Sequence, residues 1–324
     1  MEAQADRYQN IRFLFVDPPG APSRGAALGA ELDKQAKTYG YFRVMTPDTR
    51  PYDLLRLWES GCCHVDMGVD GLSAAYLRRL GSPYSVIESL QAMRTCYELG
   101  INHTSRMVVE CPGTPPAEVQ ETVDMVRRFG VAYQPLQPRK FSVGTRGDLW
   151  GGMSGTAAVE NAGAFTALLP PDVGSSLRLP WVDAADLEPS ADWSPLASVV
   201  DQWRTLHRQL LVFDGVGWFL GTRPLYYYDG GTFLKVFDRR NGHSEYVLDP
   251  LSRALYFYCM EIRQRGQVEE ALKGQGTPQD VNEIIEALLG ADLMFAEGDQ
   301  VLSLAVAYRC DIAVRRMRRY ASES

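Results

Sequence analysis

The sequence predicts an α/β first half over residues 1–145, a connector over 146–195 and a smaller α+β domain over 196–324. Three observations predict this division. Short apolar runs alternate with helical patterns in the first half, as in proteins whose parallel strands are joined by helices. Glycine, proline and serine then dominate the connector. The last part places three strand signals before two helical patterns and a hairpin signal.

In the first half, strands are predicted where apolar runs stop at proline, glycine or polar residues. These runs lie at residues 11–18, 40–46, 64–70, 104–110 and 132–138. Helices are predicted where apolar residues recur every three or four positions or where a helix-start signal occurs. They lie at residues 25–39, 50–61, 85–100 and 114–129. This alternation implies right-handed crossovers between parallel strands, and it allows either an open sheet or a barrel.

The second domain is predicted to begin with a long amphipathic helix at 196–213. Asp229-Gly230-Gly231 is a hairpin signal between two strands over 224–240. The later elements are a strand at 245–250, a helix at 251–266, a helix that starts at Thr277-Pro278 and a hairpin turning at Glu297-Gly298-Asp299. This order is that of a winged-helix-like module.

Composition limits the function classes. Apolar residues make up 45% and charged residues 23%, which are ordinary values for a soluble globular protein. The net charge of −7 disfavours a general nucleic-acid or membrane-surface binder. No apolar run is long enough to cross a bilayer, and the polar start has no signal-peptide core. We therefore expect a cytoplasmic protein with neither nucleic acid nor membrane as a partner.

Cysteine and histidine spacing predicts no metal site. The six cysteines are Cys62, Cys63, Cys96, Cys111, Cys259 and Cys310. None forms the tight spacings typical of zinc or iron–sulfur sites, and Cys62 and Cys63 point to opposite faces if they lie on a strand. The four histidines form no H-x-x-x-H pattern. We expect the cysteines to be small buried apolar residues. The alternative is a cluster assembled from cysteines that are distant in the sequence, which no spacing supports.

Residues 8–140 resemble radical S-adenosylmethionine (SAM) enzymes that act on ribosomal peptides, especially the cobalamin-dependent maturases. The matching segments are FLFVDP (13–18), DLLRLWESGCCHVDMGVDGLS (53–73), YLRRLGSPYSVIESLQAMRTCYELGI (76–101) and RMVVECPGTPPAEVQETV (106–123). The resemblance implies a partial (β/α) TIM-like barrel. It also implies a vestigial SAM site at the ends of two strands, formed by Gly68, Asp70, Glu110, Pro112 and Gly113.

This chain departs from the family pattern in three ways. It has no counterpart of the C-x-x-x-C-x-x-C loop that holds the family's [4Fe–4S] cluster, and none of the preceding cobalamin domain. The family's Gly-Ile-Glu-Ser is Gly68-Val69-Asp70-Gly71 here, and its Pro-Gly-Glu-Thr is Pro112-Gly113-Thr114-Pro115. We therefore expect no iron–sulfur cluster, no cobalamin and no autonomous radical chemistry. SAM is the one family cofactor that the barrel mouth could still bind.

The second domain resembles the peptide-recognition element of ribosomal-peptide pathways. Such an element binds an extended leader peptide by adding it as a strand to a sheet edge. We expect the edge to be strand 224–229 or strand 233–238. The predicted peptide-binding residues are Tyr226, Tyr228, Phe233, Val236 and Phe257. Alternatively, these side chains belong to the core of the domain.

Three functional hypotheses follow. The first is a catalytically degenerate protein that binds a precursor peptide and forms a homodimer, or a heterodimer with a biosynthetic enzyme, because an incomplete barrel leaves strand 11–17 unpaired. The second is a non-radical enzyme, such as a SAM-binding transferase, that uses the barrel mouth. Its candidate residues are Asp17, Arg43, either Asp66 or Asp70, Arg106 and Glu110. The third is one half of a split radical SAM enzyme.

Overall fold

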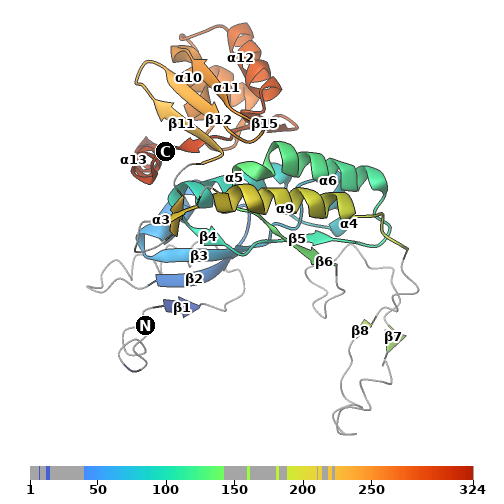
Figure 1. The fold of residues 1–324 in the computed structure, drawn as a ribbon. Helices are drawn as coiled ribbons and strands as arrows, with labels where there is room; N and C mark the ends of the chain where they lie inside the picture. The colour runs from blue at the N-terminus through green and yellow to red at the C-terminus, as the bar shows by residue number, and fades with distance from the viewer. Residues whose placement is uncertain are drawn as a thin grey trace.

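The computed structural model describes residue 7 and residues 12–14, 40–141, 159–160, 180–181, 188–209, 211–213, 218–220 and 223–323. Figure 1 shows three layers: a blue sheet, a middle layer of helices, and an orange C-terminal module on the far side of these helices. The predicted helix at 25–39, Asp17 and most of the connector lie outside the described residues. Among those residues, no helix is both long enough and apolar enough to cross a membrane.

The first half contains a sheet of parallel strands. Its strands are β1 (Arg12–Leu14), β2 (Gly40–Met45), β3 (Cys62–Met67) and β4 (Asn102–His103), in that order. A second parallel pair is formed by β5 (Arg106–Val109) and β6 (Gln137–Lys140). The Val108 amide donates to the Asp70 carbonyl at 2.8 Å, so β5 continues the sheet beyond the end of β3. This is an α/β protein whose parallel sheet is consistent with a partial (β/α) barrel.

Helices connect these strands and cover one face of the sheet. They are α3 (Pro51–Glu59), α4 (Ala74–Leu80), α5 (Val86–Leu99), α6 (Pro116–Arg128) and α9 (Ser194–Gln209). Helix α4 was not predicted, although Ser73 caps its start and Gly81 ends it in the left-handed conformation. Helix α9 lies beside α6, and its Trp203 indole donates to the Tyr133 carbonyl at 2.8 Å. The helix expected to begin the second domain thus packs on the first half.

Helix α5 is buried between the first half and the C-terminal module. Its apolar stripe was predicted correctly, but Gln91, Arg94 and Glu98 on its polar side are buried as well. The polar side is buried because the C-terminal module packs on it (Figure 1). The amphipathic pattern predicts that the apolar face of a helix is buried. In α5 the polar face is buried too, through contacts with the module that the pattern does not reveal.

The strand predicted at 132–138 lies further along the chain. Residues Gly130–Ala132 form a 3-10 turn (η1), and the strand is β6. The register with β5 pairs Arg106 with Gln137 and Val109 with Lys140. Pairing with a neighbour, which local sequence does not encode, therefore sets the position of this strand.

The module combines mixed sheets with helices. Its elements are β11 (Leu225–Asp229), β12 (Leu234–Asp238), β13 (Ser244–Leu248), α10 (Pro250–Tyr258), β14 (Arg263–Gln264), α11 (Arg265–Ala271), α12 (Pro278–Gly290), β15 (Met294–Glu297), β16 (Gln300–Ser303), β17 (Val306–Ala307) and α13 (Cys310–Glu323). One sheet has the order β13-β12-β11-β17, and the other β14-β16-β15. Two further pairs are β7 (Val159–Glu160) with β8 (Pro180–Trp181) and β9 (Leu211–Phe213) with β10 (Trp218–Leu220). The helix predicted at 251–266 is wrong beyond Tyr258, because Arg263 and Gln264 pair with β16 instead.

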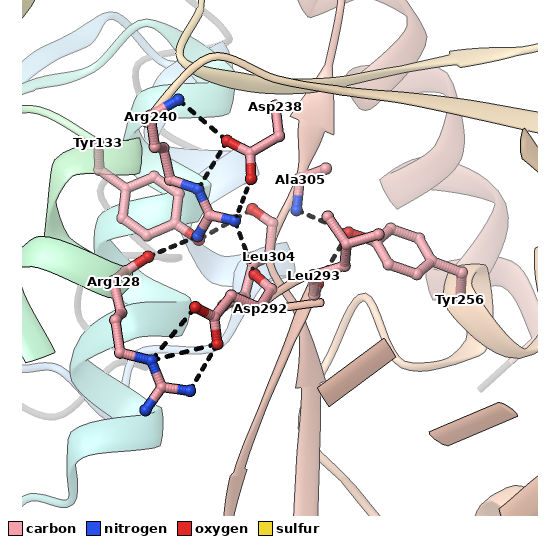
Figure 2. Close-up of polar contacts among 9 residues, drawn as sticks. All are labelled: Arg128, Tyr133, Asp238, Arg240, Tyr256, Asp292, Leu293, Leu304 and Ala305. Atoms are coloured by element: carbon pink, nitrogen blue, oxygen red, sulfur yellow. Dashed lines mark hydrogen bonds and ion pairs between the residues drawn. The ribbon is translucent and has the colours of Figure 1, made fainter. Parts of the chain in front are cut away.

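Buried polar contacts join the module to the first half (Figure 2). The Arg240 side chain is 2% exposed and pairs with Asp238 at 2.6 Å. The same guanidinium donates to the carbonyls of Arg128 at 2.6 Å and Asp292 at 2.9 Å. Arg128 also pairs with Asp292 at 2.6 Å across the junction. One guanidinium thus satisfies carbonyl groups from both halves.

A second buried contact lies between α5 and α13. The Glu98 carboxylate is fully buried, pairs with Arg316 at 2.7 Å and accepts from the Ala307 amide at 2.8 Å. Burial alone would raise the pKa of Glu98, but the guanidinium groups of Arg316 and Arg94 outweigh it and hold the pKa below its ordinary value. Glu98 is therefore a carboxylate, and it links α5 to the C-terminal helix.

Candidate functional site

The predicted SAM site lies where β3 and β5 end. Carboxyl ends of adjacent parallel strands meet at one edge, where α/β proteins usually bind ligands. Asp70 is half-buried there and accepts a hydrogen bond from the Ser82 hydroxyl at 3.0 Å. Burial raises the pKa of the Asp70 carboxyl, and the bond from Ser82 opposes this shift. Gly68 is exposed, and a Cβ added to it would meet no atom within 4 Å.

Glu110 has an unusual backbone at the end of β5. Its φ is 60°, in the left-handed region that residues other than glycine rarely occupy. Its carboxylate pairs with the Lys140 ammonium at 2.8 Å, and its side chain is 41% exposed. Such strain occurs preferentially where a side chain is held for binding or catalysis. Glu110 is the sequence-predicted residue with the clearest sign of a functional constraint.

Pro112 and Gly113 have a structural explanation. Both are half-buried in the turn after β5. Gly113 has a φ of 69°, and its amide donates to the Glu188 carbonyl at 3.1 Å. A Cβ at Gly113 would lie 2.8 Å from the Glu188 carboxylate. The turn and this close approach require glycine without any bound ligand.

A pocket of about 680 Å³ lies beside Glu110, between the ends of β5 and β6 and the start of α9. This volume is in the range of small-molecule sites. The polar side chains of its lining come from Glu110, Lys140, Ser190, Asp192 and Ser194. Gly68, Asp70, Pro112 and Gly113 do not line it, so of the predicted SAM site only Glu110 faces this pocket.

Lys140 and Asp192 were not predicted as site residues. Lys140 was missed because the strand was predicted at 132–138, before this residue. In the structure, the register of β6 pairs Lys140 with Val109 of β5. Asp192 was missed because it lies on a distant segment that only the tertiary fold brings to the mouth. No local sequence signal identifies Asp192.

The remaining strand residues proposed for catalysis lie on two different faces. Asp66 is 3.9 Å from Arg106 on a half-exposed face of the sheet. The register aligns Arg43 with the buried Val65, which places Arg43 on the opposite face. These three residues therefore do not form one cluster, and Asp17 lies outside the described residues.

The predicted peptide-binding edge is wrong. Strands β11 and β12 are both interior, since β12 pairs with β13 and β11 with β17. Long-range pairing with β17 covers β11, and the sequence gives no sign of this pairing. Among the described strands, β13 is an unpaired edge of this sheet. It exposes Ser244, Glu245 and Val247, while Tyr246 and Leu248 are half-buried.

The five predicted peptide-binding residues do not form one site. Val236 is fully buried, and Phe257 on α10 packs edge-on against Tyr227 at 5.4 Å. Tyr226 and Tyr228 lie on the opposite face of the sheet, where Tyr228 is 55% exposed. Phe233 is exposed in the β11–β12 turn. The alternative that these side chains belong to the core of the domain therefore holds for Val236, and in part for Tyr226 and Phe257.

Residues 1–126 match the family model for the radical SAM superfamily. The match covers the part of the chain that carries the parallel sheet up to helix α6. No curated protein sequence matches the chain significantly.

Three solved structures illustrate the similarity to radical SAM enzymes. Coproporphyrinogen III oxidase from Escherichia coli is 11% identical with a TM-score of 0.38, and the match covers 95% of this chain and 76% of that enzyme. The cobalamin- and [4Fe–4S]-bound methyltransferase TsrM from Kitasatospora setae is 15% identical with a TM-score of 0.36, covering 43% of this chain and 27% of that one. The cobalamin-dependent enzyme OxsB is 12% identical with a TM-score of 0.36, covering 90% and 40%. These TM-scores are too low to assign an activity.

The cysteines of this chain do not fit a cluster held by three thiolates. All six lie in the described part of the chain, and Cys62, Cys96, Cys111 and Cys259 are buried. Burial raises the pKa of Cys62 to about 12 and of Cys111 to about 11, so both are thiols at neutral pH. Within the described residues, no three His, Cys, Asp or Glu side chains gather as a metal site.

Proposed function

We propose that the chain is a catalytically degenerate radical SAM homologue that binds a precursor peptide for a separate modifying enzyme. The process would be the biosynthesis of a modified ribosomal peptide. The observation that supports this most is the unpaired edge of β13 in the winged-helix-like module.

Strand β13 offers a peptide both main-chain and side-chain contacts. Each main-chain hydrogen bond to an added strand contributes about 0.5–1.5 kcal/mol net. On one side of the edge, Tyr246 and Leu248 are half-buried and pack against the core, as does Leu251 at the start of α10. On the other side, Val247 is 69% exposed. A bound strand would therefore place alternate apolar side chains on both faces of this edge.

A modifying enzyme, or a second copy of the chain, would bind the parallel sheet. Parallel sheets are normally covered on both faces. Among the described residues, the face with His64 and Asp66 is half-exposed, and Arg106 on it is exposed. Among the described strands, β1 is an outer strand of this sheet, and a partner that also reached this edge would cover Leu14, which is 65% exposed.

The test is a titration of the full chain with the precursor peptide encoded beside it, as separate leader and core halves. We expect the leader half to bind and to slow hydrogen exchange at residues 244–248. The Tyr246→Ala and Leu251→Ala variants should bind about tenfold more weakly, since 1.4 kcal/mol corresponds to tenfold. Tyr52→Ala, which removes a 40% exposed tyrosine from α3, is the matched control. Leader binding that leaves exchange in β13 unchanged would disprove strand addition.

The second candidate is a non-radical enzyme or SAM-binding protein that uses the pocket beside Glu110. The Glu110–Lys140 pair supports it, because a carboxylate beside an ammonium complements the amino-acid end of SAM. Calorimetry with SAM and S-adenosylhomocysteine tests this candidate. SAM binding that weakens in the Lys140→Gln variant would favour this candidate. If the titrations release no heat and equilibrium dialysis also detects no bound SAM, the candidate is ruled out.

A split radical SAM enzyme is the third candidate. In that case another chain supplies the C-x-x-x-C-x-x-C loop, and the radical chemistry appears only in the complex. Reconstitution with such a chain distinguishes it from a pure scaffold. A complex that cleaves SAM only when both chains are present would favour the split enzyme.

A further inference from the structure

Four aromatic rings form a continuous surface on the outer face of the module's larger sheet. We call Tyr226, Tyr228, Phe237 and Tyr308 the aromatic platform. Tyr226 stacks on Phe237 with centroids 4.9 Å apart and an interplanar angle of 10°. Tyr308 bridges the two tyrosines of β11, at 5.5 Å from Tyr226 and 5.7 Å from Tyr228.

The strand register explains why these rings share one face. Tyr226 pairs with Phe237 and Tyr228 with Lys235, and paired residues of antiparallel strands point the same way. Tyr227 points to the other face, where it contacts Phe257 and Arg316. The module's core therefore lies on the opposite face, and the platform is on the outside.

Two rings of the platform are largely exposed to solvent, so packing in the core of the module does not explain them. Tyr228 is 55% and Tyr308 45% exposed. On the same face, Val247 of β13 pairs with Lys235, so exposed apolar side chains extend from the platform to the unpaired edge. Contiguous exposed apolar surface marks interaction sites, and tyrosine is enriched among residues that dominate binding energy.

The charges on the platform favour an acidic partner. Lys235 lies 4.8 Å from the Phe237 ring centre but is neutralised by Glu245 at 2.6 Å. Arg239 lies 5.7 Å from the Tyr226 ring centre and has no acidic partner within the described chain. Its Nε is buried without a hydrogen-bond acceptor. The Arg239 side chain as a whole is only half-buried, so a carboxylate from a ligand can pair with its guanidinium.

We propose that the aromatic platform binds an acidic, aromatic-containing peptide segment, with a carboxylate on Arg239 and apolar side chains on Tyr228 and Tyr308. The proposal rests on the peptide-binding function above and specifies the peptide class. The segment would continue across the outer face from the strand added at β13. Single-stranded nucleic acid also stacks on aromatic rings, but one unpaired cation and a net charge of −7 disfavour a polyanion.

The test uses three synthetic peptides of equal length, in which tyrosine alternates with aspartate, asparagine or lysine. Their binding to the full chain is measured by fluorescence anisotropy. We expect the aspartate peptide to bind tightest. Tyr228→Ala, Tyr308→Ala and Arg239→Gln should each weaken its binding about tenfold, a loss of about 1.4 kcal/mol. Tyr52→Ala and Arg78→Gln, which change exposed residues of the first half, should have no effect.

The outcomes separate this proposal from the proposed function. Equal affinity for the aspartate and lysine peptides would overturn the platform proposal. Platform variants that bind the aspartate peptide as tightly as the Tyr52→Ala control would also overturn it. If the precursor peptide slows hydrogen exchange in β13 and the platform variants bind this peptide as tightly as the wild type, strand addition is supported and the platform proposal fails. If the platform variants lose the aspartate peptide while Tyr246→Ala keeps it, the platform stands without strand addition. Oligothymidylate binding tighter than the aspartate peptide would also overturn the proposal.

Discussion

His103 is buried at the end of β4 without a side-chain hydrogen bond. It is 2% exposed, and neither imidazole nitrogen has a partner. Its main chain exchanges two hydrogen bonds with the Gln134 amide group, which fixes the strand end and leaves the ring unpaired. Burial, followed by the charges of His64 and His207, lowers the pKa of His103 to about 3. The ring is therefore neutral in the folded protein.

We expect His103 to make stability dependent on pH. Its ordinary pKa is about 6.5, so between pH 6.5 and 3 the unfolded chain binds a proton that the folded chain excludes. The free energy of unfolding should fall with decreasing pH in this window, by up to about 1.4 kcal/mol per unit from this residue. His103→Leu should remove that component and cost little at pH 7. Urea unfolding at several pH values, with the exposed His243→Leu as control, tests this, and identical slopes in both variants would contradict it.

The backbone of Glu110 supports a second prediction. Glu110→Gly and Glu110→Gln both remove the pair with Lys140, but only glycine relieves the left-handed conformation. We expect Glu110→Gly to be more stable than Glu110→Gln by about 1 kcal/mol. Both should weaken any ligand held by the pocket. Chemical denaturation of the two variants measures the difference, and a Gln variant as stable as the Gly variant would show that the conformation is unstrained.

At the level of elements, local capping signals were reliable. Thr277 accepts from the Asp280 amide, and Asp280 accepts from the Thr277 amide, which forms a capping box at the start of α12. The start of this helix at Thr277-Pro278 was recognised in the sequence, because capping needs only contacts within one turn.

The capping box gives a third prediction. Thr277→Ala should lower the free energy of unfolding by about 1 kcal/mol, because one amide at the helix start loses its acceptor. Thr205→Ala on α9 is the control, since that hydroxyl only donates to the Asp201 carbonyl within its own helix. Differential scanning calorimetry compares the two. A Thr205→Ala loss as large as that of Thr277→Ala would contradict the capping role.

Sheet edges, in contrast, could not be predicted from local sequence. The sequence located β11, β12 and β13, yet their neighbours depend on β17, which lies about 80 residues later in the chain. For this reason the edge that we propose for peptide binding is β13 and neither of the two predicted strands. Likewise, the pocket beside Glu110 needs Asp192 from a distant segment, so only one of its residues was foreseen.

At the scale of the whole molecule, the C-terminal module and the first half are fixed to each other. The Glu297 carboxylate in the β15–β16 turn accepts from the Ile87 amide at 2.8 Å, so it caps α5 from outside. Phe295 of the same hairpin packs edge-on against Phe129 at 5.1 Å. This hairpin is therefore engaged with the first half.

Glu98 gives the prediction that tests this coupling. Glu98→Gln would remove the carboxylate that faces the buried guanidinium groups of Arg94 and Arg316, and breaking a buried pair typically costs about 3–5 kcal/mol. Arg318→Gln, which breaks an exposed pair with Glu59, should cost less than about 1 kcal/mol. Thermal unfolding of the wild type should show one cooperative transition. Two separate transitions, or equal losses in the two variants, would contradict the coupling.

The sequence by itself determined the elements whose signals are local. These are the alternating strands and helices of the first half, the capped helix α12, the two hairpins of the module and the superfamily resemblance. Only the tertiary structure decided which strand is an unpaired edge, which polar side chains are buried on α5, and which residues meet at the pocket and on the aromatic platform. The physical reason is that helix periodicity, caps and turns are set within a few residues. Strand pairing, burial and charge compensation instead depend on partners that the fold brings together from distant positions.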